Sequence, residues 1–253
     1  MAKRARRKID RSRRAEIGAA KRTRTRTELL VTALELFGRP HGRNTRIEDL
    51  CAGAGIARGT FYNYFTGLEA VLKALSDELT RDFDSAVHAS FAALGTATER
   101  TAAAMRYYLH APLIDPRWGW AVVNTSVGHW LYGEDIAQHV VASIQEGVDS
   151  REFRIDSAAV GKDILLGAGI AATITLLGGK APEDYPEQVA RQVLISLGSS
   201  PAIAAKVTGR PMRELPMLAM NTRFFRGTLG GSDHARKPPS GSAVRRRTRI
   251  GVA

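Results

Sequence analysis

Residues 45–69, TRIEDLCAGAGIARGTFYNYFTGLE, constrain the fold of this 253-residue chain more than any other stretch. Thr45 and Glu48 have the spacing of a capping box, in which each residue accepts a hydrogen bond from the backbone N–H of the other. We therefore expect a short helix to begin at about Arg46. Apolar residues then recur at helical spacing, which gives this helix one buried face.

A glycine turn and a second short helix follow. Gly53 and Gly55 interrupt the apolar pattern, and glycine readily adopts the left-handed backbone that a tight turn between helices needs. From Ala57 to about Tyr64 the chain is expected to be helical again, with Phe61 on the buried side. Two short helices joined by such a turn form a helix-turn-helix, whose second helix lies in the major groove of DNA.

A third helix is needed to cover this pair, and residues 27–38 provide it, with apolar residues on one face and a stop at Gly38. The second helix of the pair presents Arg58, Thr60, Tyr62 and Asn63. Arg, Thr and Asn can read base edges, and hydroxyl groups commonly bind phosphate oxygens. The alternative is an ordinary amphipathic helix with a solvated polar face.

The run AGAGIARGTFYNYF, within residues 27–71, resembles the DNA-binding domain of the TetR family of bacterial transcriptional repressors. This resemblance implies an all-helical homodimer whose larger C-terminal domain binds a small ligand and releases operator DNA. Two positions depart from the family pattern. Ala57 stands where the family has a serine, which removes a capping hydroxyl worth about 1 kcal/mol. The family also has a lysine after the aromatic residues. Here the corresponding segment, Gly67-Leu68-Glu69, contains no lysine, and Lys73 is the candidate to take its place.

Positive charge is concentrated at the two ends of the chain. The formal net charge is +12, but residues 1–28 contribute +9 and residues 210–253 contribute +8, which leaves −5 between them. We predict a basic disordered arm over 1–24, a DNA-binding domain over 25–67, a ligand-binding and dimerisation domain over 68–208, and a basic disordered tail over 209–253. A basic arm beside the head can neutralise phosphates, although charge runs are often only solvated.

The predicted DNA contacts combine the arm, the helix-turn-helix and one lysine beyond it. They are Arg22, Arg24, Arg26, Thr45, Arg46, Arg58, Gly59, Thr60, Tyr62, Asn63, Tyr64 and Lys73.

The body is expected to be all-α, with helices over 68–94, 96–111, 135–148, 156–177, 186–197 and 201–207. Aromatic residues with a few polar ones gather between positions 107 and 132, a composition typical of small-molecule pockets. A packed core is the alternative for each of them. The predicted ligand-binding residues are Tyr107, Tyr108, Trp118, Trp120, Asn124, His129 and Trp130.

The last long helix pair carries small residues on one helix and an apolar stripe on the other. The family resemblance implies a dimer interface here, and an internal core is the alternative. The predicted interface residues are Gly167, Ala168, Ala171, Ala172, Val189, Val193 and Leu197.

Several classes of protein do not fit this sequence. Catalytic motifs and paired-cysteine metal spacings are not found, so we expect no enzyme, no metal and no cofactor. The apolar run at 164–179 is slightly short for a membrane span, and the single cysteine suits the cytoplasm. We therefore expect a cytoplasmic repressor that binds double-stranded operator DNA and a small, mostly apolar effector. The alternative is a DNA-compacting protein that acts through its basic tails.

Overall fold

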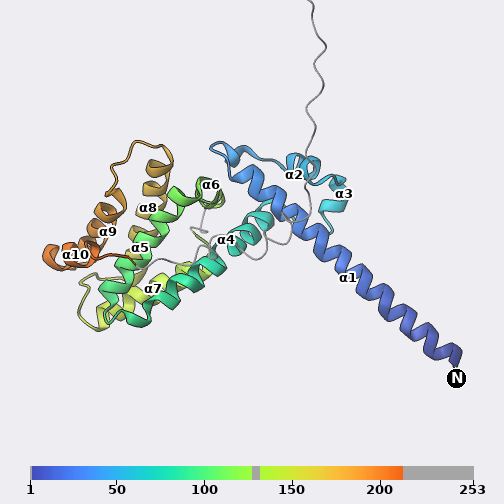
Figure 1. Ribbon diagram of the computed structural model, residues 1–253, viewed down its shortest axis with the longest axis horizontal. Coiled ribbons are helices and arrows are strands. Elements are labelled where there is room, and N and C mark those ends of the chain that lie inside the picture. Colours follow the sequence, from blue (N-terminus) through green and yellow to red (C-terminus); the bar gives the residue numbers. More distant parts are fainter. Residues whose placement is uncertain (1, 127–131, 213–253) are drawn as a thin grey trace, which may run out of the picture.

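The computed structural model describes residues 2–126 and 132–212, and every regular element in these ranges is a helix (Figure 1), which confirms the all-α prediction. The 3₁₀ helices are labelled η. In chain order the elements are α1 (Ala2–Phe37), η1 (Gly42–Asn44), α2 (Ile47–Ala54), α3 (Arg58–Phe61), α4 (Leu68–Ser90), η2 (Phe91–Ala93), α5 (Ala97–Ile114), α6 (Pro116–Thr125), α7 (Glu134–Asp149), α8 (Ala158–Leu177), α9 (Tyr185–Ser196) and α10 (Pro201–Thr208).

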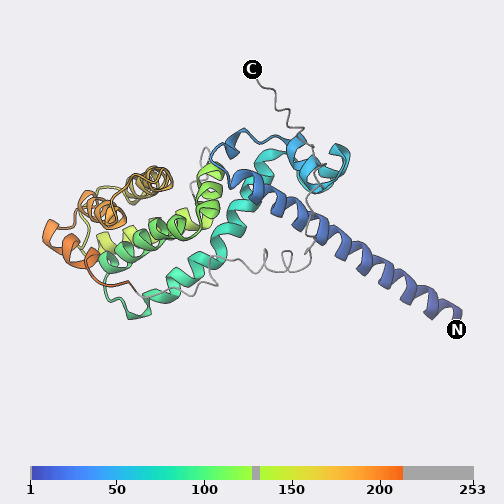
Figure 2. The same cartoon turned by 45° about the horizontal axis from the view of Figure 1, so that its top comes forward.

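Helix α1 is continuous, so the segment predicted as a disordered arm is helical from Ala2 onward. Its N-terminal half extends away from the other helices in both views (Figures 1 and 2). The segment lacks apolar periodicity, but its Ala, Arg, Lys and Glu residues are strong helix formers. The Arg24–Glu28 ion pair, at 2.9 Å and one turn apart, adds to this preference.

Helices α1, α2 and α3 form a small head around one apolar cluster. Leu30 and Phe37 of α1 pack with Leu50 of α2 and Phe61 of α3, and all four side chains are at most 1% exposed. Gly53 does not interrupt α2 as predicted; it lies inside the helix, where a Cβ would be 2.5 Å from the Thr32 side chain of α1. Glycine at this position therefore allows α1 and α2 to approach closely.

The start and end of α2 each depend on one residue. Arg46, and not Thr45, is the N-cap, and its backbone N–H donates to the carboxylate of Asp49 at 2.8 Å. The predicted capping box is therefore shifted by one residue, which leaves Glu48 available for another partner. Gly55 ends the helix with φ 66°, in the left-handed region that glycine adopts at little cost.

Helix α4 leads from the head into the body, where α5, α6 and α7 pack against it and α8, α9 and α10 pack against these helices and each other (Figure 2). The helix predicted over 96–111 is α5, which continues past Pro112 to Ile114. Residues 112–134 lie between two predicted helices, and the region around Trp118 contains the additional helix α6. Asp115 caps α6 by accepting hydrogen bonds from two backbone N–H groups in its first turn, which explains this new start.

Helix α8 is long and apolar enough to cross a membrane by length and composition alone, and 33% of its apolar window is buried in the protein. It packs against α5, α6, α7 and α9. One side of α8 is thus part of the body, and the remaining apolar surface needs another explanation.

Candidate DNA-binding surface and ligand cavity

Helix α3 is a single turn, shorter than the predicted helix over Ala57–Tyr64. Ala57 is its N-cap and provides no side-chain hydrogen bond, as expected from the missing hydroxyl. Turn hydrogen bonds continue the helical path beyond Phe61, including Phe65 N–H to the Phe61 carbonyl at 3.1 Å. Phe61 and Phe65 point into the head, whereas Tyr62 is 48% exposed on the other side.

Arg58 lies on the exposed side of α3 and has partners on both flanks. Its guanidinium is 2.8 Å from the carboxylate of Glu48 on α2, and it donates to the Tyr62 hydroxyl at 3.5 Å. The hydrogen bond to the Tyr62 hydroxyl and the negative charge of Glu48 together raise the pKa of Arg58. Arg58 therefore carries a full positive charge, and Glu48 orients it before any nucleic acid is present.

The arm arginines Arg22, Arg24 and Arg26 are exposed along α1. The Arg26 guanidinium lies 5.4 Å from the centre of the Phe65 ring, a cation–π distance. This contact connects α1 to the turn after α3, so the basic face of α1 and the exposed face of α3 belong to one surface.

Most of the other predicted DNA contacts are exposed or half-buried residues of the head, whereas Lys73 lies on α4. Arg46, Gly59 and Asn63 are exposed, and Thr45, Thr60 and Tyr64 are half-buried. The Lys73 ammonium is 3.7 Å from Asp77 and 3.6 Å from Glu134 of α7, so it is turned toward acidic groups of the body. Its role as a DNA contact stays a prediction, and sequence spacing could not show these acidic partners.

A mostly apolar cavity lies in the body between α4, α5, α7 and α8, and its volume is about 60 Å³. Tyr108 and Tyr132 contribute aromatic walls. Thr101 and Tyr132 also line it, are 5% and 3% exposed, and have hydroxyl groups without a hydrogen-bond partner among the described residues. Buried hydroxyls of this kind are costly unless a water or ligand pairs with them.

The two tyrosines of the cavity remain neutral. Burial raises the pKa of Tyr132 to about 12. Burial and the negative charge of Asp84 raise the pKa of Tyr108 well above its usual value, and the Tyr108 hydroxyl donates to Asp84 Oδ1 at 3.2 Å. The cavity therefore offers neutral hydroxyl groups, the Asp84 carboxylate, two imidazoles and one guanidinium against otherwise apolar walls.

Of the predicted ligand-binding residues that the structure describes, Tyr108 lines this cavity and four others do not. Trp118 is buried behind Tyr108, with its indole N–H donating to the Leu79 carbonyl at 3.0 Å. Tyr107 lines a separate hollow near α10, and Trp120 is half-buried elsewhere on α6. His129 and Trp130 lie outside the described residues.

Asn124 was predicted to bind a ligand, but it joins the body to the head. Its side-chain nitrogen on α6 donates to the carbonyls of Phe37 and Arg39 at 2.8 Å each. These carbonyls belong to the C-terminal end of α1, where backbone groups lack helical partners. Asn124 is 4% exposed, so the contact is shielded from water.

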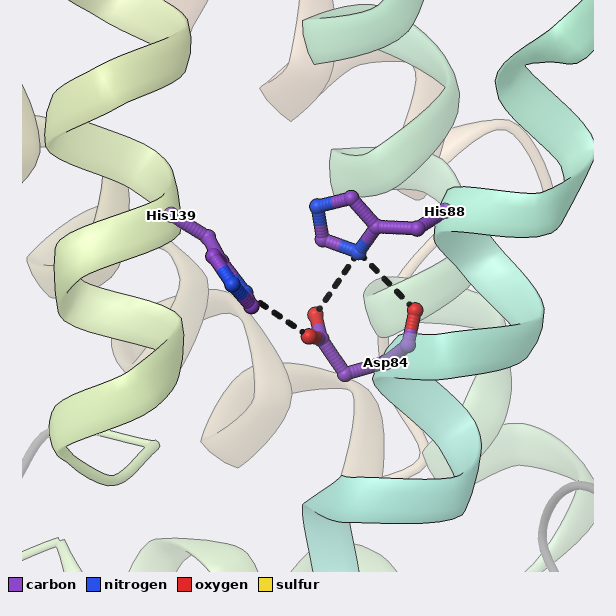
Figure 3. A group of neighbouring side chains, drawn as sticks. All are labelled: Asp84, His88 and His139. Atoms are coloured by element: carbon purple, nitrogen blue, oxygen red, sulfur yellow. Dashed lines mark hydrogen bonds and ion pairs between the residues drawn. The ribbon is translucent and has the colours of Figure 1, made fainter.

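Sequence reasoning missed a polar cluster at the rim of the cavity, formed by Asp84 and His88 of α4 and His139 of α7 (Figure 3). A partial signal exists in the sequence, because Asp84 and His88 are four residues apart and share one helix face. His139 is 55 residues from Asp84, and only the packing of α7 on α4 brings it near.

The predicted dimer residues divide into two groups. Ala172 and Leu197 are at most 3% exposed within one protomer, so they belong to its core and need correction as interface residues; Val193 is 4% exposed but lines the groove between α8 and α9. Gly167 and Ala171 are exposed, and Ala168 and Val189 line an open, mostly apolar groove between α8 and α9.

Large apolar side chains extend the exposed face of α8. Val160 is 52% exposed, Ile164 36% and Ile174 44%. Together with the groove, they form an apolar face that one protomer leaves uncovered.

Cys51 is 6% exposed in the head core, and burial together with the Glu48 charge raises the pKa of its thiol. It remains a neutral packing residue, as its position in the sequence suggested.

Two family models match the chain. Residues 29–75 match the model described as bacterial regulatory proteins, tetR family, and residues 97–210 match the tetracyclin repressor-like C-terminal domain. Together they take in more than half of the chain, covering both the head and the body.

One curated relative matches a part of the chain. It is the HTH-type transcriptional regulator EthR of Mycolicibacterium smegmatis, 44% identical over 57 residues, or 22% of this chain. The match spans 26% of that relative's length.

Solved structures match the head and body together. RolR in complex with the ligand resorcinol has a TM-score of 0.65 and 25% identity, covering 78% of this chain and 100% of that one. The fatty acid degradation regulator FadR of Bacillus halodurans has a TM-score of 0.53 and 15% identity, covering 69% and 97%. The FadR likeness concerns the fold alone.

Proposed function

The chain belongs to the TetR family of bacterial transcriptional regulators, and from this premise we propose that it is a homodimeric repressor that leaves operator DNA when a small effector binds. Each protomer inserts the exposed face of α3 into one major groove. The single observation that carries the proposal is the uncovered face of the α3 segment, with Arg58 and Tyr62 directed away from the protein's own core.

The surface around α3 has the chemistry that DNA binding needs. Arg58 can donate two hydrogen bonds to a guanine, and Asn63 can pair with an adenine. The exposed arginines of α1 are suited to phosphate oxygens, which fix the position of a protein on the duplex. The cation–π contact of Arg26 with Phe65 supports their action as one surface.

We assign the apolar face of α8 and α9 to a second copy of the chain. Its exposed residues, Val160, Ile164 and Ile174, would otherwise remain in water. Two-fold pairing also suits DNA, because a dimer doubles the contacts and matches two half-sites. This assignment accounts for the apolar surface of α8 without a membrane.

The effector is assigned to the cavity between α4, α5, α7 and α8. Its apolar walls and unpaired hydroxyls favour a small molecule with an apolar body and a few polar groups. Resorcinol, the ligand in the RolR complex, is a small aromatic diol and is consistent with this class.

A connected path leads from the cavity to the head. Asp84 and Tyr108 of the cavity lie on α4 and α5, α6 packs on both helices, and Asn124 of α6 holds the end of α1. An effector that binds more tightly to a form with shifted heads moves the population away from the DNA-binding form.

The proposal predicts specific DNA recognition by α3. Fragments selected from genomic DNA by the full chain should share an operator, and Arg58→Ala should weaken binding to it by about 1–3 kcal/mol in a gel-shift titration. Arg151→Ala, an exposed arginine of the body, is the control. Equal operator affinity in Arg58→Ala and the parent protein would refute the assignment of α3.

A sequence-tolerant DNA-compacting protein was the alternative, and the family matches give it no support. Competition with random DNA at about 0.2 M salt separates the two functions, because purely electrostatic binding is lost there. A regulator of this kind acts on the chromosome in the cytoplasm, and we assign no catalytic reaction to the cavity.

A further inference from the structure

Asp84, His88 and His139 bring three potential metal ligands to one point. One ligand atom from each residue lies within 4.8 Å of the other two, and this is the one group of that kind among the described side chains, residues 13–126 and 132–212. His139 Nδ1 is 2.9 Å from Asp84 Oδ2, and His88 Nδ1 is 3.4 Å from Asp84 Oδ1 (Figure 3). Ligands of one zinc ion, each about 2.0–2.2 Å from it, are separated by similar distances.

We propose that Asp84, His88 and His139 bind a divalent transition metal ion, such as Zn²⁺, at the rim of the effector cavity. Two imidazoles and one carboxylate form a donor set that suits zinc and its neighbours in the first transition row. The two histidine ring centres are 4.7 Å apart, and each ring has its Nδ1 within 3.4 Å of the same carboxylate, so small side-chain rotations would place the three donors around one ion.

The surroundings of the cluster support a metal site. The Tyr108 hydroxyl donates to Asp84 Oδ1 at 3.2 Å, the outer hydrogen bond that orients a ligating carboxylate. His88 Nδ1 also lies 3.0 Å from the Asp84 carbonyl, which already faces a helical N–H, so this contact can be given up without an unpaired carbonyl. Arg100 also lines the cavity, and its charge is balanced by an ion pair with Glu146.

Three protein ligands leave at least one coordination position open. Asp84, His88 and His139 all line the cavity, so this position faces the space assigned to the effector. A metal here favours an effector with an oxygen donor, such as a phenolate or carboxylate. This last step rests on the proposed function, whereas metal binding itself does not.

Titration of the metal-free full chain with Co²⁺ and Zn²⁺ tests the site. We expect visible absorption bands of cobalt in a low-symmetry site, saturating at one equivalent per protomer, and displacement of cobalt by zinc. His139→Ala should abolish saturable binding; His139 is 52% exposed, so the variant is expected to fold. His41→Ala, which removes an exposed histidine of the head, should leave binding unchanged.

Tyr108→Phe provides a second readout, because it keeps all three ligands and removes only the outer hydrogen bond. We expect it to weaken Zn²⁺ binding about 10- to 100-fold. Absence of saturable cobalt binding, or equal binding by His139→Ala and the parent protein, would overturn the proposal. Operator binding by the metal-free protein would still test the proposed function separately.

Discussion

Single residues set the orientation of the DNA-binding surface. Glu48 was expected to cap α2, but the start of that helix uses Arg46 and Asp49 instead. Glu48 is therefore available to hold Arg58 at 2.8 Å. Because the cap is shifted by one residue, the Glu48 carboxylate does not cap α2 and instead positions Arg58 on the exposed face of α3.

Asn124→Ala should destabilise the protein, because two backbone carbonyls at the end of α1 lose their donor in a buried place. We expect a loss of about 1–3 kcal/mol in the free energy of unfolding, measured by urea denaturation. Asn63→Ala, at an exposed position, should change stability by no more than about 0.5 kcal/mol. Equal effects of the two substitutions would contradict the role of Asn124 as a clamp between head and body.

At the scale of helices, the start of α5 is capped from a distant part of the chain. Glu152 accepts hydrogen bonds from the backbone N–H groups of Ala97 and Thr98 at 3.1 and 2.8 Å. Burial opposes its ionisation, but these hydrogen bonds outweigh burial and lower the pKa of Glu152 below its ordinary value of 4.5. A negative charge at a helix N-terminus is also favoured by the helix dipole.

Glu152→Gln should therefore destabilise the protein by about 1–2 kcal/mol at neutral pH. A carboxylate whose pKa is lower in the folded than in the unfolded protein stabilises the fold fully at pH values above its unfolded-state pKa. This stabilisation is lost as the pH falls through the folded-state pKa. The stability difference between variant and parent should thus narrow below about pH 4.5. Urea denaturation across this range measures it, with the exposed Glu183→Gln as control; a constant difference would count against the ionised cap.

Helices α8 and α9 carry the proposed dimer interface. Ala171→Glu should convert the dimer into monomers, because an unpaired carboxylate in an apolar interface costs several kcal/mol. Sedimentation velocity measures the outcome. Ala142→Glu adds the same charge on an exposed position of α7 and should leave the dimer intact. Dimers in both variants would place the interface elsewhere.

The molecule as a whole combines a basic rod with a mildly acidic body. Arg22 and Arg24 lie on α1, the helix whose N-terminal half projects from the rest of the molecule (Figure 1). Double substitution to Gln should reduce the salt dependence of DNA binding by about 0.9 log units for each phosphate that is no longer neutralised, and a dimer doubles this effect. Affinity measured over a salt series tests this. The double variant Arg151→Gln, Lys180→Gln removes equal charge from the body and should leave the slope unchanged.

The amino-acid sequence by itself determined the helical class, the helix-turn-helix and the positions of most body helices. These features follow from the local periodicity of apolar residues and from residues such as Gly55, whose conformational preference acts within one turn. The sequence also indicated an aromatic body domain, but it could not assign Trp118 to the core and Tyr108 to the cavity, since both have the same apolar character.

Only the tertiary structure decided which distant residues meet. His139 reaches Asp84, Asn124 reaches the end of α1, and Glu152 reaches the start of α5 through packing of helices that are far apart in the chain. The helical state of residues before 25 was also missed, because helix propensity without an apolar stripe leaves no periodic signal. The spacing of apolar residues along the chain determines which face of a helix is buried. Which other helix packs against that face depends on how all the helices pack together.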